Sequence, residues 1–146
     1  VGHPNFLKNA VETFGAQCIV LSVDAKKQPD GTWEVYTDGG RERTGKNVIE
    51  WVKEATKMGV GEVMIASIDR EGTRQGYELD LIKIISGFSK IPVIAHGGAS
   101  SLNSIFEVIS TGADAVSASS IFQYNVFTIR EVKRFLAKKG VRMRFE

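Results

Sequence analysis

Eight residues whose types can do chemistry follow four apolar stretches of this sequence. They are Asp24, Glu71, Gly72, His96, Gly97, Gly98, Ser119 and Ser120. Carboxylates serve as general acids or bases, whereas glycine main chain and serine hydroxyls can hold an anion. The set is therefore typical of a site that binds phosphate and transfers protons.

Only a fold that gathers the ends of the apolar stretches can make these residues one site. The stretches have the length of buried strands, and the segments between them have the spacing of amphipathic helices. We expect strands at 18–25, 62–69, 91–95 and 113–119. We expect helices at 3–15, 44–59, 78–88, 101–112 and 128–140.

Local signals refine the ends of these elements. Thr44 or Asn47 is expected to cap the second helix, and Thr128 with Glu131 forms a capping-box pattern at the last one. The segment 32–37 alternates after a turn signal, which predicts a hairpin-like excursion. The first strand should be buried on both faces, with Cys18 as a small buried hydrophobe.

The alternation of strands and helices predicts an α/β fold with a parallel sheet. Residues 1–146 contain no linker, so we expect one domain. Two architectures fit: an open doubly wound sheet, or a (β/α)4 half of a (β/α)8 TIM barrel, since a complete barrel needs about 200 residues or more. A half barrel exposes two sheet edges and a strip of core, which predicts self-association.

Each candidate residue has a plainer explanation that the sequence leaves open. Gly97 and Gly98 could simply make a tight turn, instead of presenting main chain and the following helix start to phosphate. Asp24 could pair with Lys26 or Lys27, or cap a helix, instead of acting as an acid or base. His96 has no second His or Cys at ligand spacing, so we expect no metal, and the residue order suggests no Ser-His-Asp or Cys-His arrangement.

Composition excludes several classes of protein. Hydrophobic residues make up 42% and charged residues 25% of the chain, and the net charge of +2 is spread without a basic block. We therefore expect neither nucleic acid nor membrane as a partner. A single cysteine and an N-terminal stretch without a signal-peptide core indicate a cytoplasmic protein.

Several segments together resemble the cyclase subunit of imidazole glycerol phosphate synthase. These segments are "AQCIVLSVDAKK", "WEVYTDGGRERTG", "GVGEVMIASIDREGT", "IPVIAHGGAS", "GADAVSASSIF" and "TIREVKRFLAKKGVRMR". The resemblance extends from about Pro4 to Phe145 and corresponds to strands five to eight of that family's barrel.

The resemblance implies a role in histidine biosynthesis. Such enzymes use ammonia from a glutaminase subunit to convert a phosphorylated ribonucleotide into imidazole glycerol phosphate and an aminoimidazole carboxamide ribonucleotide, without a cofactor. It implies that Asp24 and Glu71 are catalytic and that Glu62 belongs to the ammonia channel, with Gln17 near the docked glutaminase. It also implies that one substrate phosphate is held by Gly72, His96, Gly97, Gly98, Ser119 and Ser120.

The half-barrel length and a few substitutions set this chain apart from that family. His96 stands where Ser is usual, and Glu71 stands where Asp is usual. The partner of Asp24 in acid–base catalysis lies on a first strand that this chain lacks. We therefore expect an isolated chain with little activity that forms a homodimer or pairs with a first-half barrel. The alternatives are a cyclase paralogue that supplies ammonia for amidination of a lipopolysaccharide sugar, and a non-catalytic phosphate-binding module.

Overall fold

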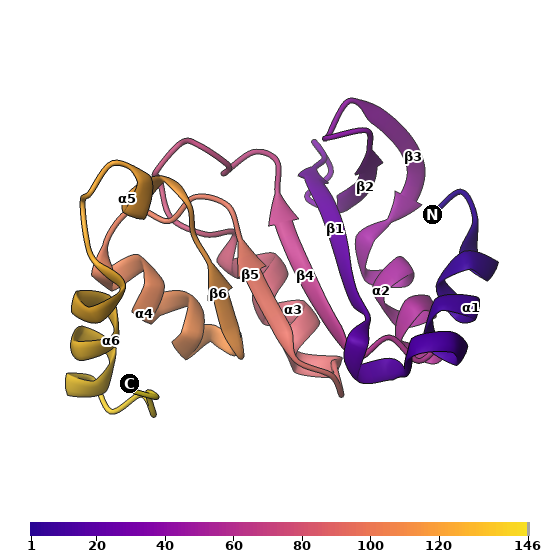
Figure 1. Cartoon of the computed structure of the whole chain (residues 1–146). Coiled ribbons are helices and arrows are strands. Elements are labelled where there is room, and N and C mark those ends of the chain that lie inside the picture. Colours follow the sequence, from indigo (N-terminus) through magenta and orange to yellow (C-terminus); the bar gives the residue numbers. More distant parts are fainter. Residues whose placement is uncertain (146) are drawn as a thin grey trace.

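A six-stranded sheet organises the chain in the computed structural model, which describes residues 1–145 (Figure 1). The strands lie in the order β3-β2-β1-β4-β5-β6, and β1, β4, β5 and β6 are parallel. The first two strand pairs, β1–β2 and β2–β3, are antiparallel. The strands are β1 Val20–Lys27, β2 Trp33–Thr37, β3 Glu42–Asn47, β4 Glu62–Ser67, β5 Val93–His96 and β6 Ala115–Ser117.

The order of the parallel strands decides between the two predicted architectures. Each parallel strand pairs with the next one along the chain, without the reversal of order that defines a doubly wound sheet. The predicted α/β class is confirmed, and the fold is a partial (β/α) barrel.

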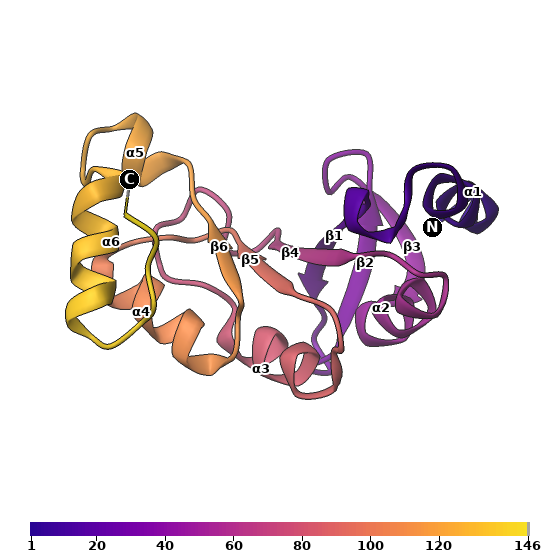
Figure 2. The same ribbon diagram turned by 60° about the horizontal axis from the view of Figure 1, so that its bottom comes forward.

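The helices that connect the parallel strands cover one face of the sheet. Figure 2 shows α2, α3 and α4 on the same side of the strands, with α1 and α6 at the two ends. The helices are α1 Pro4–Phe14, α2 Val48–Lys57, α3 Leu79–Phe88, α4 Leu102–Thr111, α5 Ser120–Gln123 and α6 Ile129–Lys138, with a 3₁₀ turn, η1, at Ala16–Cys18. No helix formed by residues 1–145 has the length and apolar character needed to cross a bilayer.

The core lies between the sheet and these helices. Val23 and Ala25 of β1 and Ile65 of β4 are almost fully buried there, and Trp51 of α2 packs into the same cluster. Burial of apolar surface of this kind is the main stabilising term of a domain.

The opposite face of the sheet is open, so the predicted burial of the first strand on both faces is wrong. Burial alternates along β1, and Val20 remains 49% exposed. In a closed barrel this face is the packed interior, whereas a four-strand arc of parallel strands cannot enclose it.

The excursion after the first strand forms a hairpin that lengthens the sheet. Strand β2 pairs with residues 24–27 of β1, so β1 runs to Lys27 and Asp24 lies within the strand and not at its end. One of the two predicted free edges is therefore partly covered, although residues 20–23 have no partner on that side. Residues 44–47, expected to start a helix, belong instead to β3 (Glu42–Asn47), because this segment pairs with β2.

An ion pair between the exposed Arg43 and the buried Glu34 joins β2 and β3. The Arg43 side chain donates to Glu34 with Nη2 2.7 Å from Oε2, and the Gly45 amide donates to Glu34 Oε1 over 2.8 Å. These donors hold the pKa of Glu34 below its ordinary value. The pair explains why a polar segment adopts strand structure here.

The predicted helix ends are largely confirmed. Asn47 caps α2, since its side chain accepts from the amides of Ile49 and Glu50, and Thr128 and Glu131 form a complete capping box. Cys18 is exposed, contrary to its predicted burial, because it belongs to η1 before β1 begins.

Candidate functional site

A row of four residues crosses the parallel strands on the open face of the sheet. Asp24 is in register with Ala66, Ala66 with His96, and His96 with Ser117. Residues paired in register across neighbouring strands place their side chains on the same face. Two of the predicted site residues, Asp24 and His96, therefore face the same space.

The Asp24 carboxylate is paired with neither of the two nearby lysines. Lys27 pairs with Glu78 and Asp80, at 3.7 and 3.9 Å, and Lys26 Nζ lies 5.4 Å from the centre of the Tyr36 ring. Within the described part of the chain, no side chain makes an ion pair or hydrogen bond with the Asp24 carboxylate. The alternative explanation of Asp24 as half of a salt bridge to either lysine is therefore wrong.

A hollow of about 340 Å³ lies in front of Asp24. Its walls include Gly39 from the hairpin, Ile68 after β4, and Glu71 from the following loop. The two predicted catalytic carboxylates thus line one hollow.

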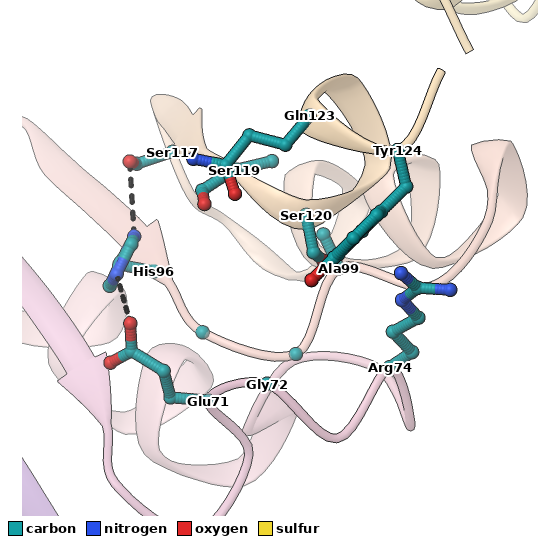
Figure 3. A pocket seen from close by; sticks show the side chains of 13 residues that line it. Glu71, Gly72, Arg74, His96, Ala99, Ser117, Ser119, Ser120, Gln123 and Tyr124 are labelled. Carbon is teal, nitrogen blue, oxygen red and sulfur yellow. Dashed lines mark hydrogen bonds and ion pairs between the residues drawn. The ribbon is translucent and has the colours of Figure 1, made fainter. Parts of the chain in front are cut away.

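The predicted phosphate-binding residues meet around a second, adjoining cavity of about 430 Å³ (Figure 3). The cavity lies at the carboxyl ends of β4, β5 and β6, where ligands bind in parallel α/β folds. Its lining contains Glu71, Gly72, Arg74, His96, Gly97, Gly98, Ala99, Ser117, Ala118, Ser119, Ser120, Gln123 and Tyr124. All six residues predicted to hold phosphate are in this set.

The two adjacent glycines are required by contacts within the protein. Gly97 and Gly98 have φ values of 92° and 91°, which side-chain-bearing residues rarely adopt. A Cβ on Gly97 would lie 2.9 Å from the Ser67 carbonyl oxygen, and one on Gly98 would overlap the Gly76 carbonyl. The tight turn therefore explains why both positions are glycine. The main chain of both glycines also lines the cavity.

Donors in the cavity come from the main chain of these loops. Within residues 1–145, the amides of Gly98, Ala99 and Ser119 donate to no other atom of the chain. The start of α4 contributes less than predicted, because Ser101 accepts from the Ser104 amide in a capping box. Free amides on two neighbouring loops suit an anion.

The cation of the cavity was not predicted. Arg74 lies in the β4–α3 loop, and its guanidinium lies 4.7 Å from the centre of the Tyr124 ring. Arg70 of the same loop turns away to pair with the buried Glu78 at 3.5 Å. Nothing in residue type separates the two arginines, so only the loop conformation, with φ of 55° at Arg74, identifies the one that faces the cavity.

A chain of hydrogen bonds runs along the wall of the cavity. His96 Nδ1 is 3.0 Å from Ser117 Oγ, and His96 Nε2 is 3.3 Å from Glu71 Oε1 (Figure 3). An ionised carboxylate only accepts, so Nε2–H donates to Glu71 and, in the neutral ring, Nδ1 accepts from the Ser117 hydroxyl. The residue order did not suggest this Ser–His–Glu arrangement.

Tyr77 packs behind Ser117 in the same cavity wall. It is buried, and its hydroxyl donates to the Ser117 carbonyl over 3.3 Å. Burial raises the pKa of Tyr77 to about 12.

Tyr77 should therefore ionise well above the ordinary tyrosine pKa near 10. Because its folded pKa exceeds its unfolded value near 10, its stabilising effect is complete below pH 10 and is lost as the pH rises towards 12. Absorbance at the phenolate band during an alkaline titration should show a delayed step that Tyr77→Phe removes. Ionisation of Tyr77 near pH 10 in the folded chain would contradict this expectation.

Glu62 and Gln17 lie at the opposite end of the strands. Glu62 opens β4 and is in register with Val20, the first residue of β1, while Gln17 belongs to η1 just before it. Neither lines the cavity or the hollow at the carboxyl ends.

No group of three or more His, Cys, Asp or Glu among the described residues could hold a metal ion. The site combines carboxylates, an imidazole, free amides and an arginine at the carboxyl ends of parallel strands. A family model described as "Histidine biosynthesis protein" matches residues 1–128, most of the chain. The chain belongs to this histidine biosynthesis family.

Proposed function

We propose that this chain is the phosphate-binding half of an ammonia-dependent cyclase of histidine biosynthesis, corresponding to strands five to eight of a (β/α)8 barrel. The observation that carries the proposal is the convergence of two loops with free amides on one cavity, next to a hollow lined by Asp24 and Glu71. Such a pair of spaces suits a ligand with a phosphate at one end and a reacting group at the other.

In this proposal the substrate is a phosphorylated ribonucleotide. Its phosphate accepts hydrogen bonds from the amides of Gly98, Ala99 and Ser119 and pairs with Arg74. Asp24 transfers protons as general acid or base, because it is partly buried and unpaired. Ammonia from a glutaminase subunit enters past Glu62 at the far end of the strands.

The isolated chain is expected to bind phosphate with little or no turnover. A barrel of eight strands surrounds its substrate, whereas this arc supplies one side of the mouth. A second copy, related by a two-fold axis, can cover the open face that carries Val20 and Ile94. Pairing with a separate first-half chain would cover the same face.

Phosphate binding is tested by calorimetric titration with inorganic phosphate and with ribose 5-phosphate. Arg74→Gln should lower the affinity for both ligands by about tenfold, because one charge-assisted hydrogen bond is lost. Arg41→Gln is the matched control, since Arg41 is exposed on the hairpin and pairs only weakly with Asp38 at 3.7 Å. Wild-type protein that binds neither probe at millimolar concentration would refute the proposal.

Self-association is tested by sedimentation velocity at micromolar concentration. The wild-type chain should sediment as a dimer, and Val20→Lys should shift it towards monomer because a charge would enter the covered face. Glu12→Lys also adds positive charge, but on exposed helix α1 outside the sheet, and should leave the dimer intact. A monomeric wild-type chain would contradict this part of the proposal.

A further inference from the structure

We propose that Ser117, His96 and Glu71 form a nucleophilic relay, in which Ser117 accepts an acyl group from a small carboxylic ester bound in the 430 Å³ cavity. This activity is separate from the cyclase chemistry proposed above, which involves no serine nucleophile. It uses the same cavity but a different set of reacting atoms.

The first element of the relay is the contact between nucleophile and base. A serine hydroxyl is a weak nucleophile unless a neighbouring base takes its proton. Ser117 Oγ lies 3.0 Å from His96 Nδ1, within the reach that proton transfer needs. The two residues are register partners on β5 and β6, so the backbone of the sheet fixes their relative position.

The second element is the orientation of the base. Glu71 Oε1 lies 3.3 Å from Nε2, which holds the proton on that nitrogen and leaves Nδ1 free to act as the base. A carboxylate in this position also stabilises the imidazolium that forms during the reaction. The imidazole is only 21% exposed, so the ring is held between its two partners.

The third element is a set of donors for the charge that develops. The amides of Gly98, Ala99 and Ser119 line the cavity and have no acceptor within the described chain. Amides of this kind stabilise the oxyanion of a tetrahedral intermediate. Tyr77 steadies the nucleophile, because its hydroxyl binds the Ser117 carbonyl.

The reaction balances with an ester and water alone. Ser117 Oγ attacks the carbonyl carbon, its proton passes to His96 Nδ1, and the carbonyl electron pair moves to the oxygen. Collapse expels the alkoxide, which takes the proton from Nδ1 and leaves as an alcohol, giving acyl-Ser117. Water then attacks the acyl group and gives a proton to Nδ1, and Ser117 departs and recovers it as the acid is released.

The test is covalent labelling with a fluorophosphonate, which forms a stable adduct only with an activated serine. Intact mass should show one adduct on the wild-type chain, and peptide mapping should locate it on Ser117. Ser117→Ala should take up none, and His96→Asn should react about 100-fold or more slowly because the general base is gone. Ser22→Ala is the matched control, since Ser22 lies exposed on the same sheet face of β1 and should not affect labelling.

Hydrolysis of p-nitrophenyl acetate by the same proteins gives the second readout. The wild-type chain should release a burst of nitrophenol, as expected when an acyl-enzyme accumulates. If Ser117→Ala fails to fold, the mapped adduct on the wild-type chain decides alone. An unlabelled wild-type chain, an adduct on another residue, or undiminished labelling of a folded His96→Asn variant would overturn the proposal.

Discussion

Replacing Gly98 with alanine should lower the free energy of unfolding by roughly 2–5 kcal/mol. The φ of 91° costs an L-residue about 1–2 kcal/mol, and crowding of a packed site adds about 1–3 kcal/mol. The added Cβ would overlap the Gly76 carbonyl and lie 2.9 Å from Arg70 Cβ, so main chain must move. Because domains are stable by about 5–15 kcal/mol, this variant should lose a substantial part of its stability.

Urea denaturation followed by circular dichroism measures the effect, and Gly72→Ala supplies the control. Gly72 has a φ of 74° in the same cavity wall, but a Cβ there would meet nothing within 4 Å. Gly72→Ala should therefore lower the free energy of unfolding only by the cost of the positive φ, about 1–2 kcal/mol. Equal losses of unfolding free energy in the two variants would show that the packing of residues 97–98 against residue 76 contributes little to stability.

Gly98→Ala should also weaken phosphate binding. The Gly76 amide donates to the Gly98 carbonyl over 2.8 Å, and this bond ties the β4–α3 loop to the loop after β5. Movement of Gly98 therefore displaces the loop that carries Arg74. Any Gly98→Ala protein that remains folded should bind inorganic phosphate more weakly than Gly72→Ala.

Changing Asp24 to asparagine should reduce ammonia-dependent turnover by about 100- to 10,000-fold in an assembly that completes the barrel. Asparagine has nearly the same shape but cannot accept and return a proton. The affinity for inorganic phosphate should stay nearly unchanged, because Asp24 lines the 340 Å³ hollow and not the cavity with the free amides.

The assay mixes each variant with a separately made first-half chain and measures formation of the imidazole product from ammonia. Asp80→Asn is the control, since Asp80 is an exposed carboxylate in the first turn of α3. Full turnover by Asp24→Asn would remove Asp24 from the chemistry. Phosphate binding without turnover in any assembly would instead favour a non-catalytic phosphate-binding module.

Much of the fold was predictable from signals that act over a few residues. Helical spacing and the caps at Asn47 and Thr128 depend on neighbouring residues alone, and these predictions agree with the structure. The last strand is shorter than predicted, 115–117 instead of 113–119. Alternation of strands and helices then restricts the topology to parallel arrangements. The grouping of the predicted phosphate residues around one cavity follows from that topology, since the carboxyl ends of parallel strands meet at one edge.

Other features depend on partners far away in the chain. Residues 42–47 become a strand only because β2 lies beside them, and this hairpin also extends β1 beyond Asp24. Cys18 is exposed because η1 precedes the strand, which an apolar run does not reveal. Helical and strand preferences are too weak to override such tertiary pairing.

The chemistry of the site divides in the same way. The sequence by itself determined that Glu71, the two glycines and the serines would follow the strands, because each one is set by its place in its own strand–loop unit. Only the tertiary structure decided that Arg74 and not Arg70 faces the cavity, and that His96 joins Ser117 to Glu71. Those contacts join separate strand–loop units, and their distances depend on strand register and loop conformation, which no local pattern encodes.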